Sequence, residues 1–367
     1  MEKAMKQRGR TISWALALWC AASLSSAAIA AISGLPKLIC GIENIEDLVA
    51  LPHSPWLIGS NMGNAELQNG GFFLIDTRTD KVSRVPLDFS PAIKTEAPYD
   101  QCPAPPTAAF SSQGLGLKQN RDGTATLFAV SHGGRQAIEV FRVSYRAKAP
   151  AIRWIGCIMP PPFANMNSVA PRADGSVVMS AAIAGEVPMV QTPQGMLIRP
   201  DIKVEDLTGG TFLWTRAEGW REISAGKLKL NNGVVLSRDE QWAFVASWSQ
   251  RSVTYLPLDP SRGGARTIPL GFNPDNLRWT ADGKIAAAGH VGYTMQQVSA
   301  CVLGNNPHCA LNYAAAEIDP RRFTVTQLYN GKGTHDFGMA TVALKTRNAV
   351  WLGSARSTCL GKLKLHR

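Results

Sequence analysis

Residues 231–248, NNGVVLSRDEQWAFVASW, contain two short apolar runs separated by a polar turn at residues 237–241. Apolar runs on either side of such a turn are typical of a β-hairpin. The first strand, however, starts on Asn231, Asn232 and Gly233, and asparagine and glycine are depleted in strands. We therefore expect the residues at the start of this strand to have a role other than stabilising the strand.

The same pattern occurs six times along the chain. Each copy has a polar start, an apolar strand, a polar turn and a second apolar strand that ends in small residues. Asp-Gly, which suits the positive φ angles of tight hairpin turns, forms three of the turns, at residues 122–123, 174–175 and 282–283. The copies begin at Ile45, Ser112, Asn165, Asn231, Asn273 and His335.

The spacing of the copies predicts the fold class. They follow one another at intervals of roughly 40 to 70 residues, which suits a four-stranded unit with variable loops. Further strand candidates, such as GGFFLIDT and AIEVFRVSY, fill the intervals. The sequence thus predicts an all-β fold, with residues 32–367 forming one six-bladed β-propeller of four-stranded blades around a central channel. A pair of β-sandwiches is the alternative, but it would not repeat one hairpin six times.

The N-terminal 31 residues are expected to form a signal peptide. MEKAMKQRGR is basic, ISWALALWCAASLSS is apolar, and SSAAIAAISG supplies the small residues of a cleavage site. The mature protein is then predicted to be periplasmic or secreted, with no stable membrane insertion after cleavage. An uncleaved membrane anchor is the alternative, although the apolar run is short for a span.

Cysteine content and charge narrow the class of protein further. Six cysteines lie beyond the predicted signal, which in an exported protein indicates disulfides, although six cysteines allow 15 pairings. One pairing that suits their positions is Cys301–Cys309, Cys40–Cys359 and Cys102–Cys157. The formal net charge is +11, yet basic residues form no long run and do not alternate with aromatic ones, so no nucleic-acid partner is expected.

The polar strand starts are candidate metal ligands. In a propeller the innermost strands run along the channel, so matching positions of the six copies form a ring at one end of it. Oxygen ligands without nitrogen or sulfur suit Ca²⁺ or Mg²⁺ rather than zinc. The alternative is that these residues only cap strands and turns. The six positions are Glu46-Asp47, Gln113-Gly114, Asn167-Ser168, Asn232-Gly233, Asp275-Asn276 and Asp336-Phe337.

Four of these motifs, in this order, resemble a known family: the calcium-dependent six-bladed propellers of the senescence marker protein (regucalcin), gluconolactonase and paraoxonase group. The motifs are GIENIEDLVALP, NMNSV, NNGVVLSRDEQWAFVA and NPDNLRWTADG. The resemblance implies one Ca²⁺ at the channel axis, which polarises a lactone or ester carbonyl and activates a water molecule. The implied ligands are Glu46, Asn167, Asn232, Asp275 and, on the paraoxonase branch, Asn276.

The chain departs from the paraoxonase pattern at two points. Gln113 stands where that branch has the first histidine of a dyad, although His132 matches the second. The resemblance therefore favours Asp275 as the proton acceptor, with His132 as a second candidate catalytic residue. Asp47 fits the pattern of a second, structural calcium, but Ser168 does not, so only one ion is expected.

Two further histidines are candidates for a role at the channel. His290 resembles a paraoxonase position near the site, and His335 precedes the sixth strand start. The segment of residues 182–210 is expected to form loops at the channel mouth.

These observations favour an exported calcium-dependent hydrolase whose partner is a small-molecule lactone or ester. The alternative is a non-catalytic propeller with structural calcium that binds a small ligand or a protein partner. Gln113 and the lack of a GxSxG motif favour this alternative. A propeller like strictosidine synthase, without a metal, is a third hypothesis.

Overall fold

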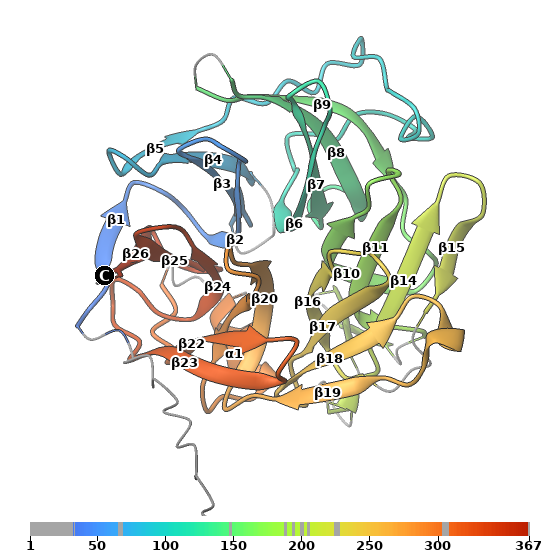
Figure 1. Ribbon diagram of the computed structural model, residues 1–367. Helices are drawn as coiled ribbons and strands as arrows, with labels where there is room; N and C mark the ends of the chain where they lie inside the picture. Colours follow the sequence, from blue (N-terminus) through green and yellow to red (C-terminus); the bar gives the residue numbers. More distant parts are fainter. Residues whose placement is uncertain are drawn as a thin grey trace, which may run out of the picture. The chain divides into compact units, whose positions relative to one another are not determined.

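Six four-stranded antiparallel sheets surround a common axis, as the ribbon in Figure 1 shows. In this computed structural model the described residues are 32, 34–64, 69–146, 149–186, 189–192, 195–198, 202–203, 206–223, 228–302 and 308–365. The innermost strand of each sheet contacts the innermost strands of its two neighbours, which closes the ring. The protein is thus a six-bladed β-propeller, as the hairpin repeat predicted, and the predicted signal peptide lies outside the described residues.

The first three blades follow the chain order from the axis outward. Blade 1 contains β2 (Ile45–Ala50), β3 (Trp56–Asn61), β4 (Gly71–Asp76) and β5 (Lys81–Arg84). Blade 2 contains β6 (Ser112–Gln119), β7 (Ala125–Ser131), β8 (Ala137–Ser144) and β9 (Ala151–Ile158). Blade 3 contains β10 (Ala164–Pro171), β11 (Val177–Ala184), β14 (Gly210–Thr215) and β15 (Gly219–Glu222). The segment predicted to form mouth loops carries an inserted hairpin, β12 (Met189–Thr192) and β13 (Gly195–Ile198).

The last three blades include the chain closure. Blade 4 contains β16 (Asn231–Leu236), β17 (Trp242–Ser247), β18 (Ser252–Pro257) and β19 (Arg266–Pro269), with a short 3₁₀ helix, η2 (Pro260–Arg262), before β19. Blade 5 contains β20 (Asn273–Trp279), β21 (Ile285–His290), β22 (Tyr313–Asp319) and β23 (Thr324–Gly331), and α1 (Met295–Val302) follows β21. Blade 6 contains β24 (Ala340–Lys345), β25 (Ala349–Ser354), β26 (Cys359–Lys364) and the N-terminal strand β1 (Lys37–Cys40).

The two ends of the described chain are joined in blade 6. Strand β1 pairs antiparallel with β26, and Cys40 lies opposite Cys359 in this register. The two cysteines form a disulfide across 319 residues of sequence, which limits how far the unfolded chain can expand. Strands from both ends of the chain therefore close the ring, and the Cys40–Cys359 pair is the one that the sequence suggested.

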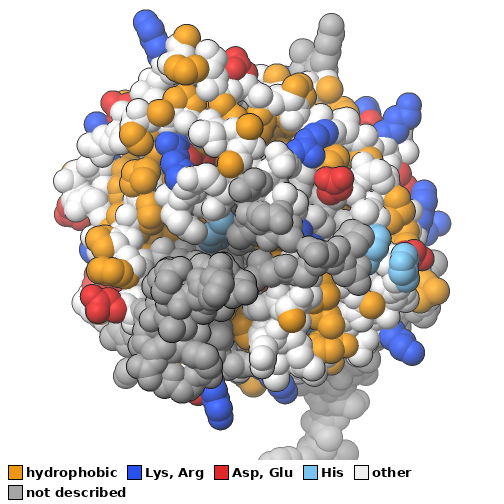
Figure 2. All heavy atoms as spheres, turned by 180° about the vertical axis from the view of Figure 1, so that it is seen from behind, with side chains coloured by type: hydrophobic (Ala, Val, Ile, Leu, Met, Phe, Trp, Pro, Cys, Tyr) orange, Lys and Arg blue, Asp and Glu red, His pale blue; other side chains and the backbone are white. Residues whose placement is uncertain are grey.

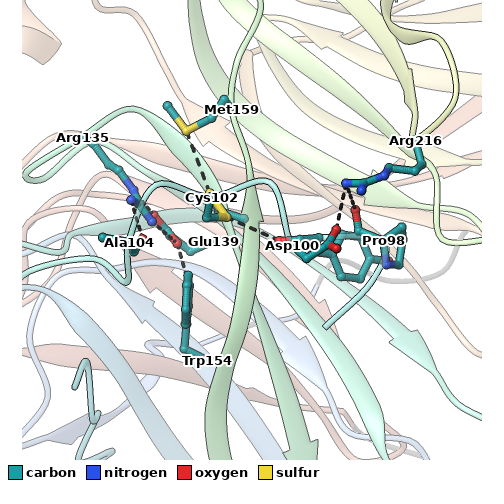
Figure 3. Close-up of a disulfide and its surroundings, with 11 residues drawn as sticks. Pro98, Asp100, Cys102, Ala104, Arg135, Glu139, Trp154, Met159 and Arg216 are labelled. Carbon is teal, nitrogen blue, oxygen red and sulfur yellow. Dashed lines mark hydrogen bonds and ion pairs between the residues drawn. A yellow bond between two sulfur atoms is a disulfide. The ribbon is translucent and has the colours of Figure 1, made fainter. Parts of the chain in front are cut away.

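A second disulfide, Cys102–Cys157, ties the long connection between β5 and β6 to the outer strand β9 (Figure 3). Beside it, Arg135 forms an ion pair with the buried Glu139 at 2.7 Å and donates to the Ala104 carbonyl oxygen at 2.7 Å. Further along the same connection, Arg216 of blade 3 pairs with Asp100 at 2.8 Å. The connection is thus held against two blades.

The third disulfide, Cys301–Cys309, follows α1. All three predicted pairs are therefore present, and three disulfides in one chain indicate an oxidising compartment. Among the residues with a described structure, none of the helices is long and apolar enough to cross a membrane.

Candidate functional site

All six innermost strands break register with the second strand of their blade at the same level. Such a bulge leaves residues unpaired in the ladder and re-aims their side chains. Four of these strands are also preceded by a residue with left-handed backbone, at φ angles between 47° and 59°: Asn44, Phe163, Leu230 and Met339. The breaks fall at Glu46–Asp47, Gln113–Gly114, Asn167, Asn232–Gly233, Asp275–Asn276 and Thr341.

Five of the six bulges lie at the predicted strand starts, whereas the sixth prediction was wrong. Asp336 precedes β24, and its side chain is 68% exposed beside His335. Thr341 takes the corresponding place in β24 and donates its hydroxyl hydrogen to the Glu46 carbonyl oxygen at 2.7 Å. The sixth hairpin starts later than its polar residues suggested, so His335 and Asp336 do not belong to this ring.

Glycine at two of the bulges lets neighbouring strands approach closely. A Cβ atom on Gly233 would lie 2.6 Å from the Leu277 backbone nitrogen and 2.7 Å from the Asn276 Cα atom. A Cβ atom on Gly114 would lie 2.3 Å from the Asn167 carbonyl oxygen. Neither position has room for a side chain, because the backbone of the next blade fills it.

The predicted ligand residues converge at the axis from four blades. Asn276 donates its amide hydrogens to Oε1 of Glu46 at 2.8 Å and to the Glu46 carbonyl oxygen at 3.2 Å. Asn232 contacts Asp275 through its side-chain amide. Glu46, Asn232, Asp275 and Asn276 are all buried, and Asn167 is half-buried. Hydrogen bonds thus link Glu46, Asn276, Asp275 and Asn232, while Asn167 lies at the matching bulge of blade 3. Their role as metal ligands stays a prediction.

Four oxygen atoms of this cluster are buried without a hydrogen-bond partner: Oε2 of Glu46 and the Oδ1 atoms of Asn167, Asn232 and Asn276. Buried polar atoms nearly always have a partner, because leaving one unpaired costs roughly 1–3 kcal/mol. The oxygens come from different strands, so together they form a polar cradle. Within the described residues, His, Cys, Asp and Glu alone form no group of three that could hold a metal, so any cation here needs the amides.

The two carboxyl groups of the cradle repel each other. Burial raises the pKa of Glu46 well above its usual value, and the charges of Asp275 and Asp47 raise it further. Burial also raises the pKa of Asp275, with a further contribution from Asp47. A cation between the two groups would relieve both effects, so the donor set and its electrostatics fit a hard divalent ion.

Below the cradle, a buried ion pair spans the channel. Arg278 of β20 contacts the Asp47 carboxylate of β2 and donates to the carbonyl oxygens of Leu48 at 2.6 Å and Leu115 at 2.9 Å. Asp47 also accepts from the backbone N–H groups of Leu48 at 2.8 Å and Leu115 at 2.7 Å. Burial raises the pKa of Asp47 to about 6, although Arg278 opposes the shift. Arg278 therefore supplies the positive charge that faces Asp47, and the number of bound ions stays a prediction.

His290, at the end of β21, lies on the other side of Asp275. Its Nε2 atom is 3.7 Å from Oδ2 of Asp275, and its Nδ1 atom accepts a hydrogen bond from Trp248 Nε1 at 3.0 Å. Burial lowers the pKa of His290 to about 4, so the ring is neutral at physiological pH.

His132 is held within the protein. Its Nδ1 atom lies 2.7 Å from Nε2 of Gln136, and the ring also makes a hydrogen bond to the Met166 backbone. Burial lowers the pKa of His132 to about 4. Its catalytic role stays a prediction.

An apolar cluster lies over the end of the channel where the cradle is. Leu230 and Met339 directly precede the innermost strands β16 and β24, and Val298 reaches them from α1. Arg356 donates to the carbonyl oxygens of Val302 at 2.5 Å and Gly63 at 2.7 Å, which joins the end of α1 to blade 1. The cluster contains Met62, Leu230, Trp248, Val298, Cys309, Met339 and Ala355.

Figure 2 shows the molecule from behind the view of Figure 1, with lysine and arginine side chains scattered singly over this face rather than gathered in one patch. This distribution matches the sequence pattern, in which basic residues form no long run.

Three residues at or near the axis were not among the predicted site residues. Arg278 and Thr341 lie on innermost strands, and Trp248 directly follows β17. The signal that could have identified Arg278 is its position on the same strand as Asp275, three residues further on.

Comparison with known proteins supports the architecture. No protein-family model matches the sequence, and no curated protein matches it. Among solved structures, a Bacteroides thetaiotaomicron protein of unknown function aligns with a TM-score of 0.53 and 10% identity over 88% of this chain and 70% of its own. A putative gluconolactonase aligns with a TM-score of 0.49 and 14% identity over 92% of this chain and 96% of its own.

Virginiamycin B lyase from Staphylococcus aureus aligns with a TM-score of 0.48 and 10% identity over 90% of this chain and 99% of its own. At identities this low, the likeness concerns the fold alone. The function therefore has to be argued from the residues of the site.

Proposed function

We propose that this propeller is an exported calcium-dependent hydrolase of lactones or esters, similar to the gluconolactonase and paraoxonase group. The observation that carries the proposal is the cradle of buried oxygen atoms without partners, supplied by Glu46, Asn167, Asn232 and Asn276. With Asp275, these residues offer two carboxylates and three amides, a set that suits Ca²⁺. When bound, such an ion polarises a substrate carbonyl and lowers the pKa of a water molecule.

Within this proposal, Asp275 is the proton acceptor. Its carboxylate is buried at the axis, where water is scarce and a proton transfer is not shared with bulk solvent. The attacking water would lose a proton to Asp275 while its oxygen bonds to the carbonyl carbon. The bond between that carbon and the alcohol oxygen then breaks, and the alcohol oxygen takes the proton back from Asp275. The apolar cluster that contains Val298 and Trp248 would limit the access of bulk water to the site.

The test compares turnover with and without the ion. Purified protein should hydrolyse members of a panel that includes γ-butyrolactone and 4-nitrophenyl acetate in calcium, and lose this activity in a chelator. Asn232→Ala should lose calcium binding and turnover together. Asn120→Ala is the matched control, because among the described residues the Asn120 amide makes hydrogen bonds to Thr124 and Thr126 in a turn. Equal rates in calcium and chelator would refute the proposal.

A non-catalytic propeller with structural calcium is the second candidate. Two observations favour it: Gln113 in place of a histidine, and the apolar cluster over the channel end. It predicts that calcium raises the melting temperature, since the ion binds only the folded state, while no panel substrate is turned over. The three disulfides support a periplasmic or secreted location in either case.

A further inference from the structure

The protonation of His290 follows from its contact with Trp248. An indole N–H can only donate a hydrogen bond, so the Nδ1 atom of His290, 3.0 Å from Trp248 Nε1, must be an acceptor without a hydrogen. The proton of the neutral ring is therefore on Nε2. A doubly protonated ring would place two hydrogens between Nδ1 and the indole.

The Nε2–H group of His290 faces the cradle without a partner. Its side chain is 2% exposed, and Nε2 has no hydrogen-bond partner in the described part of the chain. The nearest charged oxygen is Oδ2 of Asp275 at 3.7 Å, which is beyond hydrogen-bond distance. Because an unpaired buried N–H is unfavourable, its position beside Asp275 indicates that a ligand atom completes it.

We infer that His290 is a neutral hydrogen-bond donor to an oxygen atom of the bound ligand, and that Trp248 is the positioning residue that holds it in this state. The identity of the ligand rests on the proposed function: a carbonyl-bearing ester or lactone, whose oxygen gains negative charge when water attacks. With its hydrogen on Nε2, the ring has no free lone pair toward the cradle. His290 is then not the base, and proton acceptance is left to Asp275.

The first experiment reads the tautomer directly and needs no activity. Nitrogen NMR of the full mature protein labelled at histidine, with the His290 signals assigned from His290→Gln, should show a protonated Nε2 and an unprotonated Nδ1 at neutral pH. Trp248→Phe keeps an aromatic ring in the apolar cluster but removes the N–H, so the ring should then populate both tautomers. A wild-type ring protonated on Nδ1, or on both nitrogens, would overturn the inference.

The second experiment asks whether a ligand oxygen accepts this hydrogen bond. Acetate and γ-butyrolactone, titrated separately into calcium-treated protein, should shift the Nε2 resonance of His290, whereas an unmoved resonance with both probes would overturn the donor role. This readout is independent of turnover. If no panel substrate is hydrolysed, the proposed function is refuted. The NMR reading of the tautomer and the ligand titration still test the donor role of His290 in that case.

Turnover then separates a donor role from a packing role. His290→Leu should lower kcat/KM about 100-fold, the usual loss for one oxyanion donor. His290→Gln, whose amide can donate from nearly the same position, should recover at least about 10-fold of that loss, and Trp248→Phe should lower kcat/KM by about 10-fold. Equal losses in the Gln and Leu variants would contradict the donor role.

Discussion

Replacing Arg278 with methionine should strongly destabilise the propeller. The Asp47 carboxylate is fully buried, and Arg278 is the cation that contacts it across the channel. Methionine keeps much of the apolar stem but leaves Asp47 as a buried charge without a counter-ion. Breaking a buried pair from one side typically lowers the free energy of unfolding by about 3–5 kcal/mol. Arg278 also donates hydrogen bonds to the carbonyl oxygens of Leu48 and Leu115. Because methionine cannot donate to them, we expect a loss in the upper part of this range.

The expected shift in melting temperature follows from the size of the folded unit. For residues 31–367 the entropy of unfolding is about 0.7 kcal/mol/K, so a loss of this size lowers the midpoint by about 4–7 °C. The double variant Asp47→Asn with Arg278→Met removes both charges and should recover at least about 2 kcal/mol of the loss.

Urea unfolding of chelator-treated protein measures the free energy of unfolding, and calorimetry measures the melting temperature. Arg322→Met is the matched control, because the Arg322 side chain is 82% exposed and its contact with Asp319 is at 4.0 Å. The control should change stability by less than about 0.5 kcal/mol. The reasoning is refuted if Arg278→Met stays within about 1 kcal/mol of wild type, or if the double variant is as unstable as the sum of the single ones.

Three further predictions concern the cradle, the strand spacing and the ring closure. Burial raises the pKa of Glu46, so the stability that this group contributes without a cation is present at low pH and is lost as pH rises through its folded pKa. Glu46→Gln should therefore raise the melting temperature of chelator-treated protein above that of wild type at about pH 8 but not at about pH 4. A melting temperature below wild type at about pH 8 would contradict the repulsion between the carboxylates of the cradle. Gly233→Ala should cost about 1–3 kcal/mol, and Gly271→Ala, where a Cβ meets nothing within 4 Å, should be nearly neutral in the same urea titration. Serine at Cys40 and Cys359 should cost up to about 5.7 kcal/mol in the chain-entropy model, against about 2.5 for Cys301 and Cys309, and equal losses in calorimetry would contradict the loop-length argument.

The sequence alone was enough to predict the six-bladed architecture, because a local hairpin pattern marks each blade. A polar turn between two apolar strands is encoded within about 20 residues, so six hairpins could be counted without knowing how they pack. The same locality explains why Glu46, Asn167, Asn232, Asp275 and Asn276 were found. They occupy one position of a repeated motif, and a ring of blades brings equal positions together.

The sixth blade shows where the local pattern was insufficient. Asp336 has the right chemistry at the polar start, but the strand begins only at Ala340, so Thr341 reaches the bulge instead. The left-handed backbone of Phe163, Leu230 and Met339 is also invisible in the sequence, since these residue types do not favour it. Backbone geometry at the bulges is imposed by neighbouring blades.

The sequence by itself determined the number of blades and indicated the side chains that form the cradle, whereas the pairing of Cys40 with Cys359 was one of 15 possible sets until the structure showed it. Only the tertiary structure decided what surrounds them. Arg278 neutralises Asp47 from across the channel. Trp248 of blade 4 donates a hydrogen bond to Nδ1 of His290 in blade 5, which determines that the ring hydrogen is on Nε2. Both depend on side chains that are distant in sequence and meet only at the axis, where burial makes every unpaired charge and N–H energetically important.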